Sequence, residues 1–254
     1  MRVAVITPYY KEPRAWLARC VASVRAQTHA CEHLVIADGH PQDWLDDAGV
    51  RHLRLDRAHA DYGNTPRSIA GQLAVSEGFD AVAFLDADNW YEPEHVALCC
   101  AVAEKSGADY VAARRFWVRE DGSRLPYEAP EDRQGQHVDT SCFFLTFAAF
   151  HALPRWALMP KPMAMIGDRF FLASLREDGL EGALSPRCTV NYLCTWKAVF
   201  DEIGEPAPPT AKPWVPVEKL HRWARQLQAE DFRQIRRLAG CDVQALLGLD
   251  CDAA

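Results

Sequence analysis

The sequence contains no run of about 18 consecutive apolar residues, the length that a membrane-spanning helix needs. We therefore expect no transmembrane segment. Basic residues are also in the minority, because 28 Lys and Arg face 35 Asp and Glu, which leaves a formal net charge of -7. This balance argues against general nucleic-acid binding, which requires a concentrated basic surface. The apolar run at the N-terminus is too short for a secretion signal and is typical of a first strand.

Cysteine pairs with metal-binding spacing are missing as well. The nine cysteines include the adjacent Cys99 and Cys100 but no Cys-x-x-Cys pair. An odd set of this kind fits buried thiols in a reducing compartment better than a disulfide framework or a zinc site, so we expect a cytoplasmic protein. Internal repeats and low-complexity tracts are absent too. What remains is an ordinary globular composition, 49% hydrophobic and 25% charged over 254 residues, with enough chain for an ample core.

Strand and helix patterns alternate over residues 1–118. Short apolar runs that end in turn residues predict strands, and amphipathic stretches between them predict helices. The alternation favours an α/β fold with a mostly parallel sheet covered by helices. The expected strands span residues 3–7, 33–37, 50–55, 81–85 and 110–118, and the expected helices begin near Pro13, at Thr65-Pro66 (as N-cap and first helical residue) and at Pro93.

The rest of the chain has a different pattern. We expect a long surface loop over 119–136, a strand within 137–147, an irregular segment over 153–165, a helix over 167–178 and a last strand over 188–196. Five prolines within 205–216 exclude a helix there. These patterns divide the chain into a main domain (1–200, with halves 1–118 and 119–200), a Pro-rich connector (201–216) and a C-terminal helical extension (217–254).

The helical extension carries one apolar stripe. Leu220, Trp223 and Leu227 recur at helical spacing, which is typical of a face packed into a core or of a contact between subunits. A homo-oligomer formed through these helices is therefore one possibility that the sequence leaves open.

Two carboxylates close the most apolar stretch of the chain. Asp86 and Asp88 follow residues 81–85, and side chains two apart in a strand point to the same face. Ligands bind at the carboxyl ends of strands in open α/β sheets, and a pair of carboxylates suits a hard divalent cation. The alternative is a solvated turn, because Asp-x-Asp also occurs by chance. A second copy, Asp250-Cys-Asp252, follows no strand pattern and is assigned to chance.

Five segments follow one another in a familiar order. They are residues 5–12 (Val-Ile-Thr-Pro-Tyr-Tyr-Lys-Glu), residues 16–28 with a Ser-Val-x-x-Gln-Thr ending, Asp38-Gly39, Gly63-Asn64 with Arg67 and Ala70, and Leu85-Asp-Ala-Asp-Asn89. In this order and spacing the chain resembles a family 2 glycosyltransferase with the GT-A fold, over roughly residues 2–200. The resemblance implies an inverting sugar transferase whose donor is a nucleotide sugar, with UDP as the family's commonest nucleotide.

The resemblance also implies roles for individual residues. Asp88, together with Asp86, would hold Mn²⁺ or Mg²⁺ against the donor diphosphate. Arg67 is either a clamp on the diphosphate or an ordinary charge on a helix surface. Donor contacts are expected from Thr7, Pro8, Tyr9, Asp38, Asn64, Arg67, Asp86 and Ala87.

Asp168 stands where the family has its general base, at the start of a helix. An Asp there is otherwise just a favourable partner for the helix dipole. The family's usual acidic pair is Glu-Asp, whereas this chain has Gly167-Asp168. Many relatives add a histidine metal ligand after the base, but residues 189–197 contain none, and His221 lies beyond the connector. The sequence therefore predicts a metal held mainly by Asp88, waters and diphosphate.

Three further residues are candidates for acceptor contacts: Trp90, just past the two carboxylates, and His137 and Asp139, which fall where relatives approach the acceptor. Trp90 is placed either to stack on a sugar or to pack under a loop. His137 and Asp139 are placed either to contact the acceptor or to form a hydrogen-bond network at a strand end. The acceptor itself, the donor base and the donor sugar do not follow from the sequence.

Two other functions fit parts of the pattern. A sugar-phosphate nucleotidyltransferase shares the architecture, but it normally opens with a Gly-rich loop, which residues 7–11 are not. A non-catalytic nucleotide-sugar-binding or scaffold protein would keep the pocket without turnover, and the missing Glu and His are compatible with that alternative.

Overall fold

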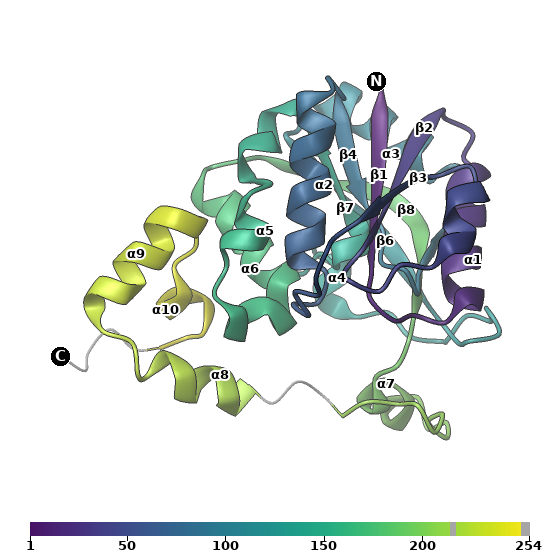
Figure 1. Ribbon diagram of the computed structural model, residues 1–254. Helices are drawn as coiled ribbons and strands as arrows, with labels where there is room; N and C mark the ends of the chain where they lie inside the picture. The colour runs from purple at the N-terminus through teal and green to yellow at the C-terminus, as the bar shows by residue number, and fades with distance from the viewer. Residues whose placement is uncertain (214–216, 250–254) are drawn as a thin grey trace.

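The computed structural model describes residues 1–213 and 217–249, which form a mixed α/β fold around one eight-stranded sheet (Figure 1). The strand order is β3-β2-β1-β4-β7-β6-β8-β5. The first four of these are mutually parallel, β6 and β8 are parallel, and β7 and β5 run antiparallel to their neighbours. The predicted α/β class with a mostly parallel sheet is confirmed. The strands are β1 (Val3–Tyr9), β2 (Cys31–Ala37), β3 (Arg51–Arg54), β4 (Ala81–Phe84), β5 (Trp90–Tyr91), β6 (Tyr110–Val118), β7 (Phe143–Thr146) and β8 (Gly182–Leu193).

Helices cover both faces of the sheet. The helices α1 (Arg14–Arg25) and α3 (His95–Ser106) pack on one face, and α2 (Asn64–Ser76) packs on the other with α5 (Arg155–Leu158) and α6 (Gly167–Glu177) beside it. Short segments connect them: η1 (Asp43–Asp47), α4 (Pro130–Arg133), η2 (Thr140–Cys142), η3 (Phe147–Ala152), η4 (Lys161–Ile166) and α7 (Lys197–Glu202). No helix in the described part of the chain is both long and apolar enough to cross a membrane.

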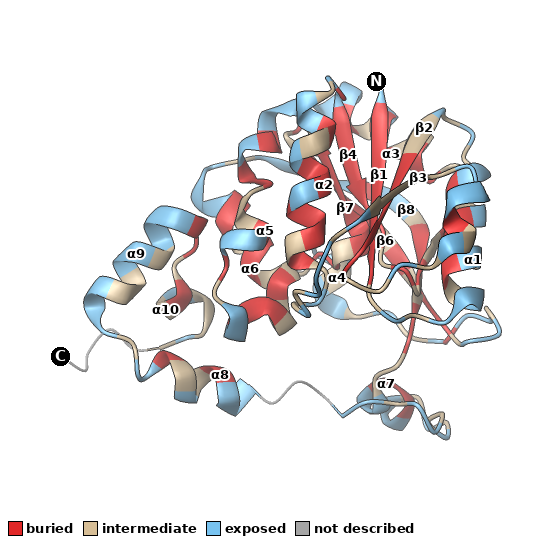
Figure 2. Ribbon diagram, in the orientation of Figure 1, coloured by how far each residue is buried: buried red, intermediate tan, exposed pale blue. Residues whose placement is uncertain are grey.

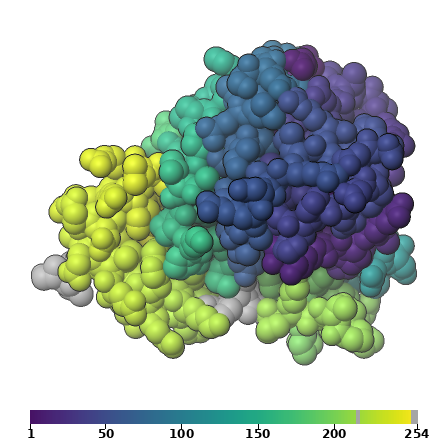
Figure 3. All heavy atoms as spheres, in the orientation of Figure 1, coloured from purple at the N-terminus to yellow at the C-terminus, as the bar shows by residue number. Residues whose placement is uncertain are grey.

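The C-terminal helices share the main core. They are α8 (Val217–Ala224), α9 (Ala229–Ala239) and α10 (Val243–Leu246), and they pack against α5, α6 and η4 (Figure 3). Leu220, Ala239 and Val243 are buried in the same cluster as the central strands. Two residues of the predicted stripe therefore face the main domain, since Leu220 is buried and Trp223 is partly buried there. The third, Leu227, follows the end of α8.

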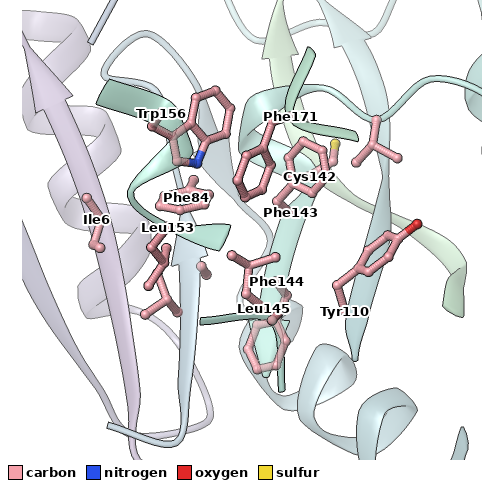
Figure 4. Packing of buried hydrophobic residues seen from close by; sticks show 14 of the residues in the cluster. Ile6, Phe84, Tyr110, Cys142, Phe143, Phe144, Leu145, Leu153, Trp156 and Phe171 are labelled. Atoms are coloured by element: carbon pink, nitrogen blue, oxygen red, sulfur yellow. The ribbon is translucent and has the colours of Figure 1, made fainter. Parts of the chain in front are cut away.

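Aromatic side chains fill the centre of the core, where the strands are buried along most of their length (Figure 2). Trp156 and Phe171 are stacked with ring centroids 4.4 Å apart, and Phe84 meets Trp156 edge-on at 5.6 Å (Figure 4). Such aromatic pairs add roughly 0.5–1.5 kcal/mol beyond the area they bury. Because Phe84 is the last residue of β4, this cluster anchors the strand that leads to Asp86.

Several predicted boundaries were wrong in the second half. The expected loop 119–136 contains the short helix α4, and the strand expected within 137–147 is limited to β7 after the 3₁₀ turn η2. The last strand begins at Gly182 rather than 188, because β8 pairs with β6 from its first residue and absorbs Pro186 at a register irregularity. A proline in a run normally argues against a strand, so the pattern alone hid this pairing.

The start of α2 also differs from the prediction. The residue before the helix is Gly63, in the left-handed region at φ 79°, and Asn64 is the first helical residue. Thr65 lies within the first turn, where its hydroxyl donates to Asp61 at 2.5 Å instead of capping the helix. The eight cysteines of the described residues are unpaired, as predicted, and Cys251 and the chance motif Asp250-Cys-Asp252 lie outside the described residues.

Candidate active site

The loop that follows β4 is held in place by buried polar contacts. The Ser141 hydroxyl accepts the backbone N–H of Asp86 at 3.1 Å and the Asn89 amide at 2.8 Å. The Asn89 side-chain oxygen in turn accepts the backbone N–H of Leu193 at 2.9 Å. Because Asn89 and Ser141 are buried, these bonds fix the backbone of the loop that carries Asp86 and Asp88. Sequence reasoning identified the carboxylates but not Ser141, whose role depends on a turn more than 50 residues away.

Asp86 is paired with the arginine that the sequence placed near the donor. Arg67 Nη2 lies 2.6 Å from Asp86 Oδ1, and its Nη1 donates to Asn64 Oδ1 at 3.1 Å. The Arg67 guanidinium also lies over the Trp156 ring, 4.8 Å from its centroid. With 2% of its side chain exposed, Arg67 is buried, which excludes the alternative of a helix-surface charge.

Asp88 lies among other acidic groups. Burial, together with repulsion from the carboxylates of Asp86, Asp139 and Glu12, raises the pKa of Asp88 to about 7. A divalent cation at this point would offset much of that repulsion, because its two positive charges would lie next to the carboxylates. The arrangement of oxygen atoms is therefore electrostatically suited to a hard cation.

The described residues limit how many ligands the chain can supply. No set of three His, Cys, Asp or Glu side chains among residues 1–213 and 217–249 converges on one point. One oxygen of Asp86 is also bound by Arg67. The donor set thus fits Mg²⁺ or Mn²⁺ held by Asp88, with help from Asp86, and otherwise by water and phosphate oxygens, which is a common arrangement for Mg²⁺. His221 lies on α8 and contacts the Leu247 carbonyl at 3.1 Å.

The predicted donor residues at the end of β1 and in the loop after β4 are mostly engaged in packing. Thr7 is fully buried and hydrogen-bonds His33 at 2.9 Å, and Tyr9 hydrogen-bonds His52 at 2.8 Å. Ala87 packs in the same small cluster as Tyr9, beside the carboxyl end of β1. Pro8 is buried against Gly63. These four side chains shape the edge of the sheet, and their contact with a donor stays a prediction.

Asp38 supports the loop that leads to α2. Its two carboxylate oxygens accept the backbone N–H groups of His59 and Ala60 at 2.8 and 2.9 Å. The next residue, Gly39, has φ 74°, and a Cβ there would lie 2.3 Å from the Ala58 nitrogen. Only glycine fits this approach, so the Asp38-Gly39 pair has a structural role whether or not Asp38 also contacts a nucleotide.

Gly167 explains how the chain departs from the family's Glu-Asp pair. It begins α6, and a Cβ there would lie 3.1–3.2 Å from the side-chain amide of Asn64 and 3.4 Å from the sulfur of Met159. The space of a larger side chain is therefore partly taken by Asn64, which also orients Arg67. The sequence showed the glycine at this position, but not that Asn64 occupies the space beside it.

Asp168 lies in the first turn of α6 and is held on both oxygens. Its Oδ1 accepts the backbone N–H of Arg169 at 2.7 Å, and its Oδ2 hydrogen-bonds His137 Nε2 at 2.8 Å. Burial raises the pKa of Asp168, but the hydrogen bond and positive charge of His137 outweigh it, so the net pKa is lowered. The carboxylate is therefore ionised at neutral pH.

His137 and Asp139 belong to one buried polar network around Arg115. The guanidinium donates to Asp132 at 2.7 Å and to Asp139 at 2.8 Å. His137 Nδ1 lies 2.9 Å from Asp132. The pKa of Asp139 is raised to about 6, because burial and the charges of Asp86 and Asp168 outweigh the opposing effect of Arg115. Asp139 is therefore electrostatically coupled to the carboxylates on both sides of the site, Asp86 and Asp168.

Trp90 does not present a bare ring face. The Arg19 guanidinium lies over the ring, 3.7 Å from its centroid, and the same arginine donates to the carbonyls of Asp88 and Glu120. This contact favours the packing alternative for Trp90. Its contact with an acceptor sugar stays a prediction.

Comparisons with known proteins agree on the fold and the family. Among curated proteins none matches. The structure is similar to that of S. aureus TarS (residues 1–349) in complex with UDP, at a TM-score of 0.60 and 16% identity over 80% of this chain and 63% of that one. It is also similar to the same S. aureus protein in complex with UDP-GlcNAc, at a TM-score of 0.63 and 15% identity over 100% of this chain and 68% of that one.

These likenesses establish the fold alone, because the identities are low. The chain spans 63% of the length of the TarS 1–349 chain in its complex with UDP. The sequence supplies the assignment to a family. The family model described as Glycosyl transferase family 2 matches residues 4–153, which include Asp38, Arg67, Asp86 and Asp88. The chain therefore belongs to glycosyl transferase family 2.

Proposed function

We propose that this protein transfers a sugar from a nucleoside diphosphate sugar, with UDP as the expected nucleotide, to an acceptor hydroxyl with inversion at the anomeric carbon. The observation that carries the proposal is the electrostatic coupling, through Asp139, of the carboxylates after β4 with the carboxylate of Asp168. Asp86 and Asp88 follow β4, Asp168 lies in the first turn of α6, and Asp139 interacts electrostatically with both sides. TarS, which shares the fold, is described with UDP and UDP-GlcNAc bound.

The donor diphosphate would lie against Asp88 and the loop after β4. When bound there, Mg²⁺ or Mn²⁺ supplies positive charge to the two phosphates of the leaving nucleoside diphosphate. Arg67 holds Asp86 so that the loop keeps its shape, and Asn64 fixes Arg67 from the other side.

Asp168 would act as the general base. As the bond between C1 and the phosphate oxygen breaks, its electron pair stays on the diphosphate, and the acceptor oxygen bonds C1 from the opposite face. The acceptor's proton moves to a carboxylate oxygen of Asp168, which is ionised and so able to accept it. Attack opposite to the leaving group inverts the anomeric configuration.

A thermal-shift screen tests the donor class. Nucleotides and nucleotide sugars are added with and without Mn²⁺, and the best binder is then assayed for release of nucleoside diphosphate. We expect a rise in melting temperature with a UDP-sugar that is larger with Mn²⁺, because a ligand that binds only the native state stabilises it. Binding without any turnover would favour the non-catalytic alternative. The absence of both binding and turnover with every nucleotide sugar tested would refute the proposal.

A further inference from the structure

The proposed base is one end of a row of charged groups. His137 bridges two carboxylates, with Nε2 2.8 Å from Asp168 Oδ2 and Nδ1 2.9 Å from Asp132 Oδ1. An ionised carboxylate only accepts hydrogen bonds, so both ring nitrogens must carry a proton for both contacts to form. The geometry therefore defines a positively charged imidazolium between Asp132 and Asp168.

The far end of the row is anchored by Arg115. Its guanidinium contacts Asp132 through two nitrogens, at 2.7 and 3.2 Å. It also lies 4.2 Å from the ring centroid of Trp117 and 4.4 Å from that of Tyr192, two rings that contact each other edge-on. Such a fork-shaped pairing fixes the orientation of the Asp132 carboxylate as well as its charge. Asp132 in turn fixes the ring of His137.

A surface ion pair also ties α4 to α6 beside the row. Arg169, the residue after the proposed base, donates to Glu131 at 2.9 Å. The groups that face His137 are thus Asp132 from α4, Asp168 from α6 and the Arg115 guanidinium from β6, which is 3.4 Å from Nδ1. Asp139, which accepts from the same guanidinium, also interacts electrostatically with His137, so three carboxylates and one arginine surround the imidazolium.

We propose that His137 and Asp132 are positioning residues for Asp168, which keep its carboxylate ionised and aim it at the acceptor hydroxyl. The inference rests on the proposed function, in which Asp168 is the base. Neither residue touches the reacting atoms. His137 occupies one lone pair of Oδ2, and the backbone N–H of Arg169 occupies one on Oδ1, so the remaining lone pairs are left in fixed directions to receive the acceptor's proton.

The imidazolium also has a chemical consequence. Without it, burial would raise the pKa of Asp168 with less opposition and so favour the protonated form of the base. With the imidazolium in place, Asp168 is ionised over the whole neutral range, although its lowered pKa also makes its carboxylate a weaker base. The proton that Asp168 receives leaves to water after the product departs, while His137 keeps both of its own protons.

The test compares His137→Gln with His151→Gln. Both histidines make a 2.8 Å contact between Nε2 and an Asp Oδ2, but His151 pairs with Asp178 on the surface, just beyond the other end of α6. For His137→Gln we expect kcat to fall about ten- to a hundredfold, as for residues that orient a reacting group, with KM for the nucleotide sugar unchanged. The acid limb of the pH–kcat profile should also move to higher pH. His151→Gln should keep the wild-type profile.

An Asp132→Asn variant and an NMR titration separate positioning from mere structure. The pKa of His137 is raised to about 9 in the folded protein: burial lowers it, but its hydrogen bonds to Asp132 and Asp168 outweigh burial. We expect its ring resonances to titrate near that value in the wild type and at lower pH in Asp132→Asn. A wild-type kcat profile in His137→Gln, or a loss of kcat with no movement of the acid limb, would overturn the inference.

The titration also keeps this inference distinguishable from the proposed function. A His137 that titrates near pH 6.5 in an enzyme active on nucleotide sugars would overturn the positioning role alone. A His137 that titrates near 9 in a protein without any turnover would instead count against the proposed transferase activity.

Discussion

Arg67 and Asp86 form an ion pair at the boundary between the core and the proposed donor site. The two groups are 2.6 Å apart, the arginine side chain is 2% exposed, and the aspartate side chain is 32% exposed. The pair thus connects the buried aromatic cluster around Trp156 with a carboxylate that reaches solvent. This connection explains why the loop after β4 can have a fixed shape before any ligand binds.

Replacing Arg67 with Met should destabilise the protein and loosen the loop. The change leaves Asp86 without its partner, and we expect the free energy of unfolding to fall by roughly 2–3 kcal/mol, below the range for a fully buried pair because part of Asp86 remains in water. Urea denaturation measures it. Arg233→Met is the control, since its pair with Glu230 is exposed and should contribute less than about 1 kcal/mol. Equal losses in the two variants would contradict the buried role of Arg67.

Gly39→Ala should lower the free energy of unfolding by more than the positive φ at this residue alone explains. The left-handed conformation costs a residue with a Cβ roughly 1–2 kcal/mol, and at Gly39 the added atom would also meet the Ala58 backbone at 2.3 Å. Gly78→Ala is the matched control, because Gly78 has the same φ of 74° and no atom within 4 Å of the added Cβ. We expect Gly78→Ala to show only the conformational cost in urea denaturation. A loss at Gly39 no larger than that at Gly78 would argue against the close approach.

The His137 network should make stability depend on pH on both sides of neutrality. The pKa of His137 is raised to about 9, from about 6.5 in the unfolded chain, so its contribution is complete below about pH 6.5 and is lost as the pH rises through 9. The pKa values of Asp132 and Asp168 are lowered: burial raises them, but their hydrogen bonds with His137 outweigh it. Their contribution is therefore present above about pH 4 and is lost on acidification. Denaturation in urea across pH 5–10 should show the alkaline loss in the wild type and a flatter curve in His137→Gln. An unchanged alkaline limb in that variant would remove His137 as its cause.

Asp88→Asn should abolish the contribution of the metal to donor binding. The proposed cation has few protein ligands, so losing one carboxylate should remove most of the extra thermal stabilisation that Mn²⁺ gives with a nucleotide diphosphate. Asp252→Asn serves as the control, since it lies in the second Asp-x-Asp copy that the sequence assigns to chance. The same dependence on Mn²⁺ in Asp88→Asn and in the wild type would place the metal elsewhere.

The first half of the fold could be predicted because its signals are local. β1, β4 and the second half of β2 are continuous apolar runs, and the turn residues after them are adjacent in sequence. The positions of Asp38, Asp86 and Asp88 at strand ends therefore follow directly. The helix that carries Asp168 was equally clear, and α6 spans nearly the expected residues.

The remaining parts of the site depend on contacts between distant segments. The sequence did not predict Arg115 as a site residue. Its partners are Asp132, in a polar stretch whose composition is typical of a surface loop, and Asp139, which follows that stretch. The burial of Arg67 likewise depends on Trp156, which is far away in sequence and belongs to a region interrupted by prolines. A single sequence carries no information on which of many polar residues such segments bring together.

Turnover of a nucleotide sugar by Asp168→Asn is the decisive measurement for the proposed mechanism. The amide keeps the shape of the side chain but cannot accept the proton of the acceptor hydroxyl, so we predict a fall in kcat of about 10²–10⁴-fold with the dissociation constant of the nucleoside diphosphate unchanged. Asp178→Asn, at the other end of α6, should retain wild-type kcat. A kcat in Asp168→Asn within a few-fold of the wild type would show that Asp168 is not the base.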